Sequence, residues 1–174
     1  MVAEERLTYT MYLEVYLQAA IVRGILETNQ DRLSNYLLVR EGEEVFSVRQ
    51  ATIERTNRKP LSAGSGEYLI YLQEVLLIAD LSTEEPAARS ELHGLFVKKD
   101  KSKALLSVGE YLLQGDLYLP AGGGLHDFLM EKSCFLPVTE ATLLDRPDIG
   151  PRTYLVNRAK IGFVSSLGRD SVQR

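Results

Sequence analysis

The sequence is poor in the residues that build disulfide frameworks, zinc sites and histidine-based catalytic centres. Its 174 residues include no tryptophan, one cysteine and two histidines. One cysteine cannot form an internal disulfide, and three such residues are too few for the usual Cys/His zinc site. The scarcity of histidine also removes most general-base chemistry near neutral pH. We therefore predict no bound metal.

An excess of positive charge is also missing. The chain has 20 Lys and Arg against 24 Asp and Glu, a net charge of −4 and a pI near 5.3. This balance argues against a nucleic-acid partner and against a basic patch that binds membranes. The most apolar stretch, residues 68–81, is interrupted by Gln73 and Glu74 and is too short to cross a bilayer. Because the N-terminus is also acidic, we expect a cytoplasmic protein without a membrane partner.

The chain repeats itself once, with a period near 90 residues. Four blocks of similar apolar pattern recur in the same order, with offsets between 86 and 92 residues. The paired blocks are 21–26 with 112–117, 33–37 with 125–129, 45–53 with 135–143, and 68–70 with 154–156. Their common order predicts a tandem duplication, since repeats of fixed period indicate repeated structural units. Chance similarity between β-rich segments is the alternative.

Alternating polar and apolar residues dominate each copy and indicate strands with one buried face. One short helix interrupts them. In the first copy Leu33, Tyr36 and Leu37 have helical spacing, with Asp31 as the expected N-cap. Gly24 and Gly115 fall inside strands at equivalent places, where glycine often marks a bulge or a close backbone approach. Each copy therefore reads as β-β-α-β-β-β.

We predict a mainly β fold of two tandem, pseudo-symmetric small barrels or sandwiches, each with about five strands and one short helix. Residues 1–82 form the first repeat, 83–102 a linker or hairpin region, and 103–174 the second repeat with a polar tail. The last two strands of each copy are expected to pair as a hairpin. The lysine-rich run 98–103 is expected to be a solvated turn.

The second copy resembles a family of uncharacterised prokaryotic β-rich proteins. The similarity rests on a Gly-Gly-x-Leu-x-Asp-Phe-Leu helix motif and on Phe-Leu-Pro-x-Thr, found in residues 122–129 and 135–139, and on Val156-Asn157. The first copy keeps the helix motif more loosely, as Arg32-Leu33-Ser34-Asn35, and Gly124 replaces its arginine in the second copy. Since the family is a domain of unknown function, the resemblance implies a fold unit and no activity.

Five residues at the two helix starts are the candidate binding residues. They are Arg32, Ser34, Asn35, His126 and Asp127. Asp127 next to His126 can serve as a helix-start acid beside a surface histidine, or the pair can act as a proton shuttle. Cys134 fits a small buried apolar residue, with a reactive thiol as the alternative.

The sequence contains no recognisable nucleophile–base set and no cofactor fingerprint. We therefore expect a non-catalytic interaction or regulatory protein, with no cofactor and no catalytic residue. The expected partner is another protein, which includes a second copy of the chain. A small-barrel module that binds a small ligand or a nucleic acid is the alternative.

Overall fold

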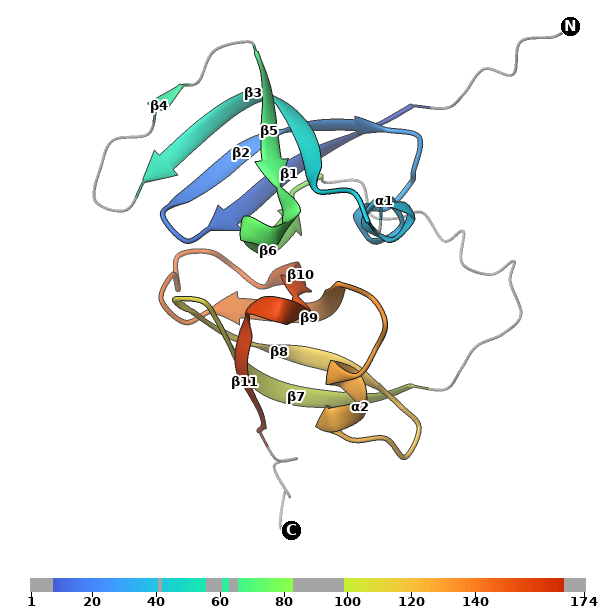
Figure 1. The fold of residues 1–174 in the computed structure, drawn as a ribbon. Coiled ribbons are helices and arrows are strands. Elements are labelled where there is room, and N and C mark those ends of the chain that lie inside the picture. The colour runs from blue at the N-terminus through green and yellow to red at the C-terminus, as the bar shows by residue number, and fades with distance from the viewer. Residues whose placement is uncertain (1–7, 41, 56–60, 63–65, 83–98, 168–174) are drawn as a thin grey trace, which may run out of the picture. The chain divides into compact units, whose positions relative to one another are not determined.

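The structure is a computed structural model that describes residues 8–40, 42–55, 61–62, 66–82 and 99–167 (Figure 1). The chain divides into two compact units, Met1–Pro86 and Ala87–Arg174. Strands make up most of the regular structure, so the predicted mainly β class is confirmed. Within the described ranges, no helix has the length and apolar character needed to cross a membrane.

Unit 1 is an antiparallel sheet in which the consecutive strands β5 and β6 lie at opposite ends of the strand order. Along the chain, its elements are β1 (Tyr9–Leu17), β2 (Ala20–Thr28), α1 (Leu33–Val39), β3 (Val45–Arg55), β4 (Leu61–Ser62), β5 (Glu67–Tyr71), the 3-10 turn η1 (Leu72–Glu74) and β6 (Val75–Asp80). The strands lie in the order β6-β1-β2-β3-β5, and the short β4 also pairs with β3. Figure 1 shows α1 beyond one end of these strands.

Unit 2 has the same sequence of major elements. They are β7 (Lys99–Val108), β8 (Tyr111–Pro120), α2 (Leu125–Leu129), β9 (Phe135–Leu143), β10 (Arg152–Asn157), the 3-10 turn η3 (Arg158–Lys160) and β11 (Ile161–Ser166). The strand order is β11-β7-β8-β9-β10. Helix α2 packs against β8 and β11 and buries Phe128.

The prediction that the last two strands of each copy form a hairpin is wrong. In unit 1, β5 pairs with β3 while β6 pairs with β1; in unit 2, β10 pairs with β9 while β11 pairs with β7. A 3-10 turn separates the two strands and redirects the chain. The run Val75–Ala79 is buried throughout, which suits a strand covered on both faces better than the arm of an exposed hairpin. Within the described residues these pairings leave both ladders open, without the ring of hydrogen bonds of a closed barrel.

Residues 99–103 of the lysine-rich run are strand and not a turn. Strand β7 begins at Lys99 and pairs with β8 along its whole length, from Lys99 opposite Pro120 to Val108 opposite Tyr111. Residues 99–102, expected in the linker, therefore belong to the first strand of unit 2. The rest of that predicted linker, 83–98, and the predicted tail, 168–174, lie outside the described residues.

Alternation along the strands builds a core in each unit. In unit 1 the fully or almost fully buried side chains include Leu13, Val15, Val48 and Ile78. In unit 2 they include Leu106, Leu113, Leu117, Leu136, Val138 and Leu143. Side chains of this size each contribute about 1.5–3 kcal/mol when fully buried. The polar positions between them form the outer face of each sheet.

A β-bulge at a glycine interrupts the second and third strands of each unit. Gly24 in β2 and Gly115 in β8 each lie opposite two residues of the next strand instead of one. The first of those two residues has a left-handed backbone, with φ of 51° at Gln50 and 47° at Glu140. The prediction of a bulge or close approach at these glycines is confirmed. A bulge bends its strand and redirects a side chain, which in unit 2 is Glu140.

Candidate functional site

The structure places the predicted binding residues at the start of α1 on the surface. Arg32, Ser34 and Asn35 are exposed, and Arg32 occupies the N-cap position without a capping side-chain hydrogen bond. The prediction that Asp31 caps this helix is wrong, because its Oδ1 instead accepts a hydrogen bond from Asn35 Nδ2 at 3.1 Å. That bond is a local surface contact across one helical turn.

Asp127 has a structural partner at the start of α2. Its Oδ2 accepts a hydrogen bond from the backbone N–H of Gly124 at 2.7 Å, which is one half of a capping box. His126 is exposed, and adjacent residues of a helix point in different directions. This geometry favours the helix-start interpretation of the pair over the proton shuttle.

Asp127→Ala is expected to lower the free energy of unfolding by about 1 kcal/mol, because it removes a capping hydrogen bond. His126→Ala, at the neighbouring exposed position, is expected to stay within about 0.5 kcal/mol of the original chain. Urea denaturation followed by circular dichroism measures both. Equal stability of the two variants would remove the capping role from Asp127.

Cys134 is exposed, so its prediction as a small buried residue is wrong. It lies in the connection before β9, where the buried pattern begins only at Phe135. Its carbonyl accepts a hydrogen bond from the backbone N–H of Arg158 at 2.9 Å. Among the residues that the structure describes, no group of three or more His, Cys, Asp or Glu side chains could hold a metal ion.

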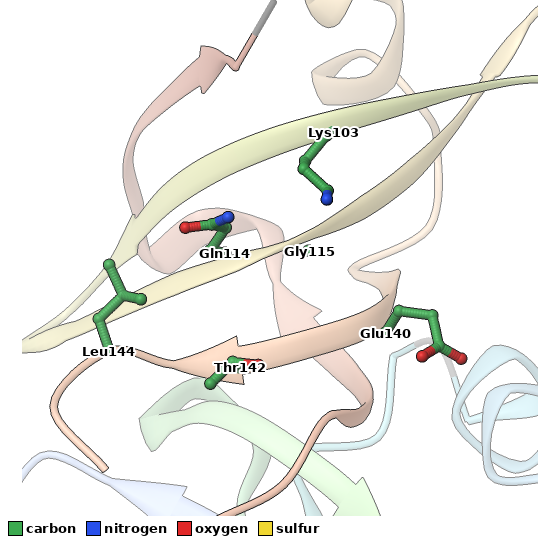
Figure 2. A pocket seen from close by; sticks show the side chains of 6 residues that line it. All are labelled: Lys103, Gln114, Gly115, Glu140, Thr142 and Leu144. Atoms are coloured by element: carbon green, nitrogen blue, oxygen red, sulfur yellow. The ribbon is translucent and has the colours of Figure 1, made fainter. Parts of the chain in front are cut away.

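An open hollow on the outer face of β7, β8 and β9 is lined by charged and neutral polar residues of unit 2. Its volume is about 320 Å³, near the lower end of the range for small-ligand pockets. It is lined by Lys103, Gln114, Gly115, Glu140, Thr142 and Leu144 (Figure 2). Strand register brings them together, since Gln114 lies directly opposite Thr142 and residues opposite each other share a face.

The lysine of the hollow has no acidic partner in the described residues, although an aspartate faces it. Lys103 lies opposite Asp116 in the register of β7 and β8. The carboxylate of Asp116 instead forms an ion pair with Lys101, whose Nζ lies 2.9 Å from Oδ2. The hydrogen bond to Asp116 raises the pKa of Lys101. Figure 2 shows the side chain of Lys103 extending from β7 toward Gly115.

The polar side chains that line the hollow form no hydrogen bonds or ion pairs with one another. Within the described part of the chain, Lys103, Gln114, Glu140 and Thr142 have no side-chain hydrogen bond or ion pair. Lys103, Gln114 and Thr142 offer an ammonium group, an amide and a hydroxyl, while Figure 2 shows the carboxylate of Glu140 directed away from these three side chains. Leu144, which is 45% exposed, adds an apolar wall. The arrangement can bind a small molecule with both polar and apolar parts.

Unit 1 carries a paired charge cluster at the matching strand positions. Counted from the bulge glycines, Arg23 matches Gln114 and Glu54 matches Leu144. Arg23 Nε lies 2.6 Å from Glu14 Oε2, and Arg23 Nη1 lies 2.6 Å from Glu54 Oε2. Burial by itself would lower the pKa of Arg23, but the hydrogen bonds to Glu54 and Glu14 raise it. These ion pairs occupy the outer face where unit 2 has its hollow.

Sequence reasoning missed this site. Lys103 was assigned to a surface turn, and Gln114, Glu140 and Thr142 were not singled out, because none belongs to a known motif. Comparison of the two copies offered one indication of a difference between them. The charged residues Arg23 and Glu54 of the first copy are replaced by Gln114 and Leu144 in the second, around a retained glycine. Comparison with known proteins finds no matching family model, curated protein or solved structure.

Proposed function

We propose that the chain is a non-catalytic binding protein that holds a small ligand in the hollow of unit 2. The observation that carries the proposal is the contrast between the two outer faces. In unit 2 four polar residues line a depression and form no ion pair with one another, whereas in unit 1 Arg23 pairs with Glu14 and Glu54. Unit 1 then has a structural role, and unit 2 has the binding role.

We also infer that the two units are divergent copies of one small β unit, of the kind that the resemblance to the uncharacterised prokaryotic family implies. Three local features recur at matching places: the bulge glycine, the left-handed residue opposite it, and the 3-10 turn before the last strand. Small five-stranded barrels can be partly open, so the open ladders of the two units are compatible with such a unit. Duplication would have allowed one copy to keep the hollow while the other lost it.

The residues of the hollow favour binding over catalysis. Nucleophilic catalysis needs a hydroxyl or thiol within hydrogen-bond reach of a base. In the described residues the hydroxyl of Thr142 has no such partner. A nucleic-acid partner is also disfavoured, because Asp116 and Glu140 lie among Lys101 and Lys103 on the same face and reduce its positive potential.

A protein partner is the second candidate, and exposed apolar side chains on the same face favour it. Phe163 is 47% exposed and lies opposite Ser107, on the outer face of β11 and β7. Leu144 and Tyr118 are also exposed on this face. Exposed apolar and aromatic side chains are enriched at protein interfaces. A partner that covers this face would use the hollow as one of its contact points.

A titration of the ¹⁵N-labelled full chain with small metabolites, grouped by charge, tests the small-ligand proposal. We expect at least one group to shift the amide resonances of Gln114, Gly115 and Thr142. The double variant Q114R/L144E introduces the charged pair of unit 1 at the matching positions, and we expect it to abolish those shifts. His126→Ala, outside the hollow, should bind as the original chain does. If no group shifts these amides, or if the double variant binds equally well, the proposal is wrong.

A further inference from the structure

The side chains along β8 identify a class of ligand for the hollow, an inference that rests on the binding function proposed above. We propose that the hollow binds a free monocarboxylate with a short alkyl chain. Lys103 and Gln114 hold the carboxylate, and the alkyl chain lies along β8 as far as Leu144.

The positive charge of Lys103 is available to a ligand. The acid opposite it in the strand register, Asp116, forms an ion pair with Lys101, whose Nζ lies 2.9 Å from Oδ2. Lys103 is exposed, and its side chain has no hydrogen bond or ion pair within the described ranges. Figure 2 shows this side chain extending from β7 toward Gly115. Because glycine has no side chain, the space above Gly115 is open to a ligand.

Gln114 adds a neutral donor beside this charge. It precedes Gly115 on β8 and lies opposite Thr142 of β9. Figure 2 shows the amide nitrogen of Gln114 on the side of the amide nearer Lys103. Ammonium and amide N–H groups both donate to a carboxylate, and the charge-assisted hydrogen bond is the stronger of the two. A carboxylate above Gly115 would therefore meet two donors from adjacent strands.

Glu140 takes no part in holding this ligand. Figure 2 shows its carboxylate directed away from Lys103 and Gln114. Its charge acts on Lys101, whose pKa is raised chiefly by the hydrogen bond to Asp116 and further by Glu140. One lysine suits a ligand with one negative charge. A phosphate monoester carries a charge of about −1.5 to −2 near pH 7, and its second charge would have no partner beside Glu140.

Leu144, which is 45% exposed, offers an apolar contact on the far side of Gln114 from Lys103. The backbone N–H of Leu144 donates to the carbonyl of Leu112 at 2.9 Å, whereas Lys103 lies opposite Asp116. These two levels of β8 are four residues apart, or about 13 Å, with Gln114 between them. Since the lysine side chain extends over β8 (Figure 2), a short alkyl chain can span the remainder. The volume of about 320 Å³ admits only a small molecule.

Titrations of the ¹⁵N-labelled full chain with hexanoate, acetate and hexanamide test the proposal. Acetate has the carboxylate without the longer alkyl chain, and hexanamide has the chain without the charge. We expect hexanoate to shift the amides of Gln114, Gly115 and Thr142 and to bind about tenfold more tightly than hexanamide. Acetate should bind about fivefold more weakly than hexanoate, because it does not reach Leu144. Equal affinity for hexanoate and hexanamide would overturn the assignment.

Single variants separate the charge from the apolar contact. Lys103→Gln should weaken the binding of hexanoate and acetate about tenfold and leave that of hexanamide unchanged. Leu144→Ser should weaken hexanoate and hexanamide about fivefold and leave acetate unchanged. Glu140→Gln should bind hexanoate at least as tightly as the original chain. Lys132→Gln, at an exposed position that does not line the hollow, is the matched charge control. If Lys103→Gln and Lys132→Gln bind hexanoate equally, the proposal is wrong.

The outcomes also distinguish this proposal from the more general one. If hexanoate and acetate fail to shift the amides of the hollow but another metabolite group shifts them, the monocarboxylate assignment is wrong and the binding function stands. If no metabolite group shifts them, both proposals are wrong.

Discussion

Replacing Gly115 by alanine is expected to lower the free energy of unfolding by about 3 kcal/mol, at the upper end of what overpacking usually costs. A Cβ at this position would lie 2.6 Å from Cβ of Ala141, 2.8 Å from Cγ1 of Val138 and 2.9 Å from Cα of Ala141. One of these atoms is backbone and the others are short buried side chains. The strain must therefore move β9 relative to β8, where the hollow lies.

Gly24→Ala is the matched control in the other unit. There the nearest atoms, the carbonyl oxygen of Arg49 and the side chain of Val48, are 3.1–3.2 Å from the added Cβ. We expect a loss of about 1 kcal/mol, since small displacements relieve such contacts. Urea denaturation followed by far-ultraviolet circular dichroism measures both variants. If Gly115→Ala is no less stable than Gly24→Ala, the close approach between β8 and β9 is not a real constraint.

Arg23→Met is expected to destabilise the protein by about 3 kcal/mol, because it removes the cation that pairs with the buried carboxylate of Glu14. Glu14, the partner that would remain, is only 3% exposed. The hydroxyl of Tyr16 also donates a hydrogen bond to Glu14 and would retain part of the compensation. The loss is measured by urea denaturation at neutral pH.

Two further variants show which partner matters. Glu54→Gln should cost at most about 1 kcal/mol, because the side chain of Glu54 is 29% exposed and solvent screens its pair. The double variant E14Q/R23M should recover part of the stability lost in Arg23→Met, since it removes the buried charge as well. The free energy of unfolding lost in Glu14→Gln alone is the reference. If the double variant is less stable than Arg23→Met by that same amount, Glu14 and Arg23 contribute independently and the ion pair adds no coupling energy.

Local patterns predicted most of the elements. The helical spacing of Leu33, Tyr36 and Leu37 places the helix that the structure has at Leu33–Val39, with these three side chains buried. The repeated apolar block 45–53 lies within β3 (Val45–Arg55). Such predictions succeed because the period of apolar residues and the secondary structure follow from neighbours in the chain.

Strand partners were harder to predict than strands. Residues 68–72 and 75–81 have strand character and are separated by two residues, the usual arrangement of a hairpin. The structure has a 3-10 turn there, and β6 pairs with β1, about 60 residues earlier in the chain. The partner of β6 is a distant segment of the chain, and no local pattern contains this information.

The hollow was not predictable from motifs for a related reason. Lys103, Gln114 and Glu140 lie on three different strands, and each is an ordinary surface residue in its own segment. Their proximity follows from the registers of β7 with β8 and of β8 with β9, including the bulge opposite Gly115. A shift of one residue in either register would move them to opposite faces.

The sequence by itself determined that the chain is mainly β and that each copy follows a strand–strand–helix–strand order, because alternation and helical spacing are local properties. It also determined where the bulges lie, through Gly24 and Gly115. Only the tertiary structure decided the strand partners and the exposure of Cys134. It also decided that Arg23 forms ion pairs on the face of unit 1, whereas Gln114, at the matching position of unit 2, lines an open hollow. These depend on register and burial between distant segments, where many pairings satisfy the same local pattern.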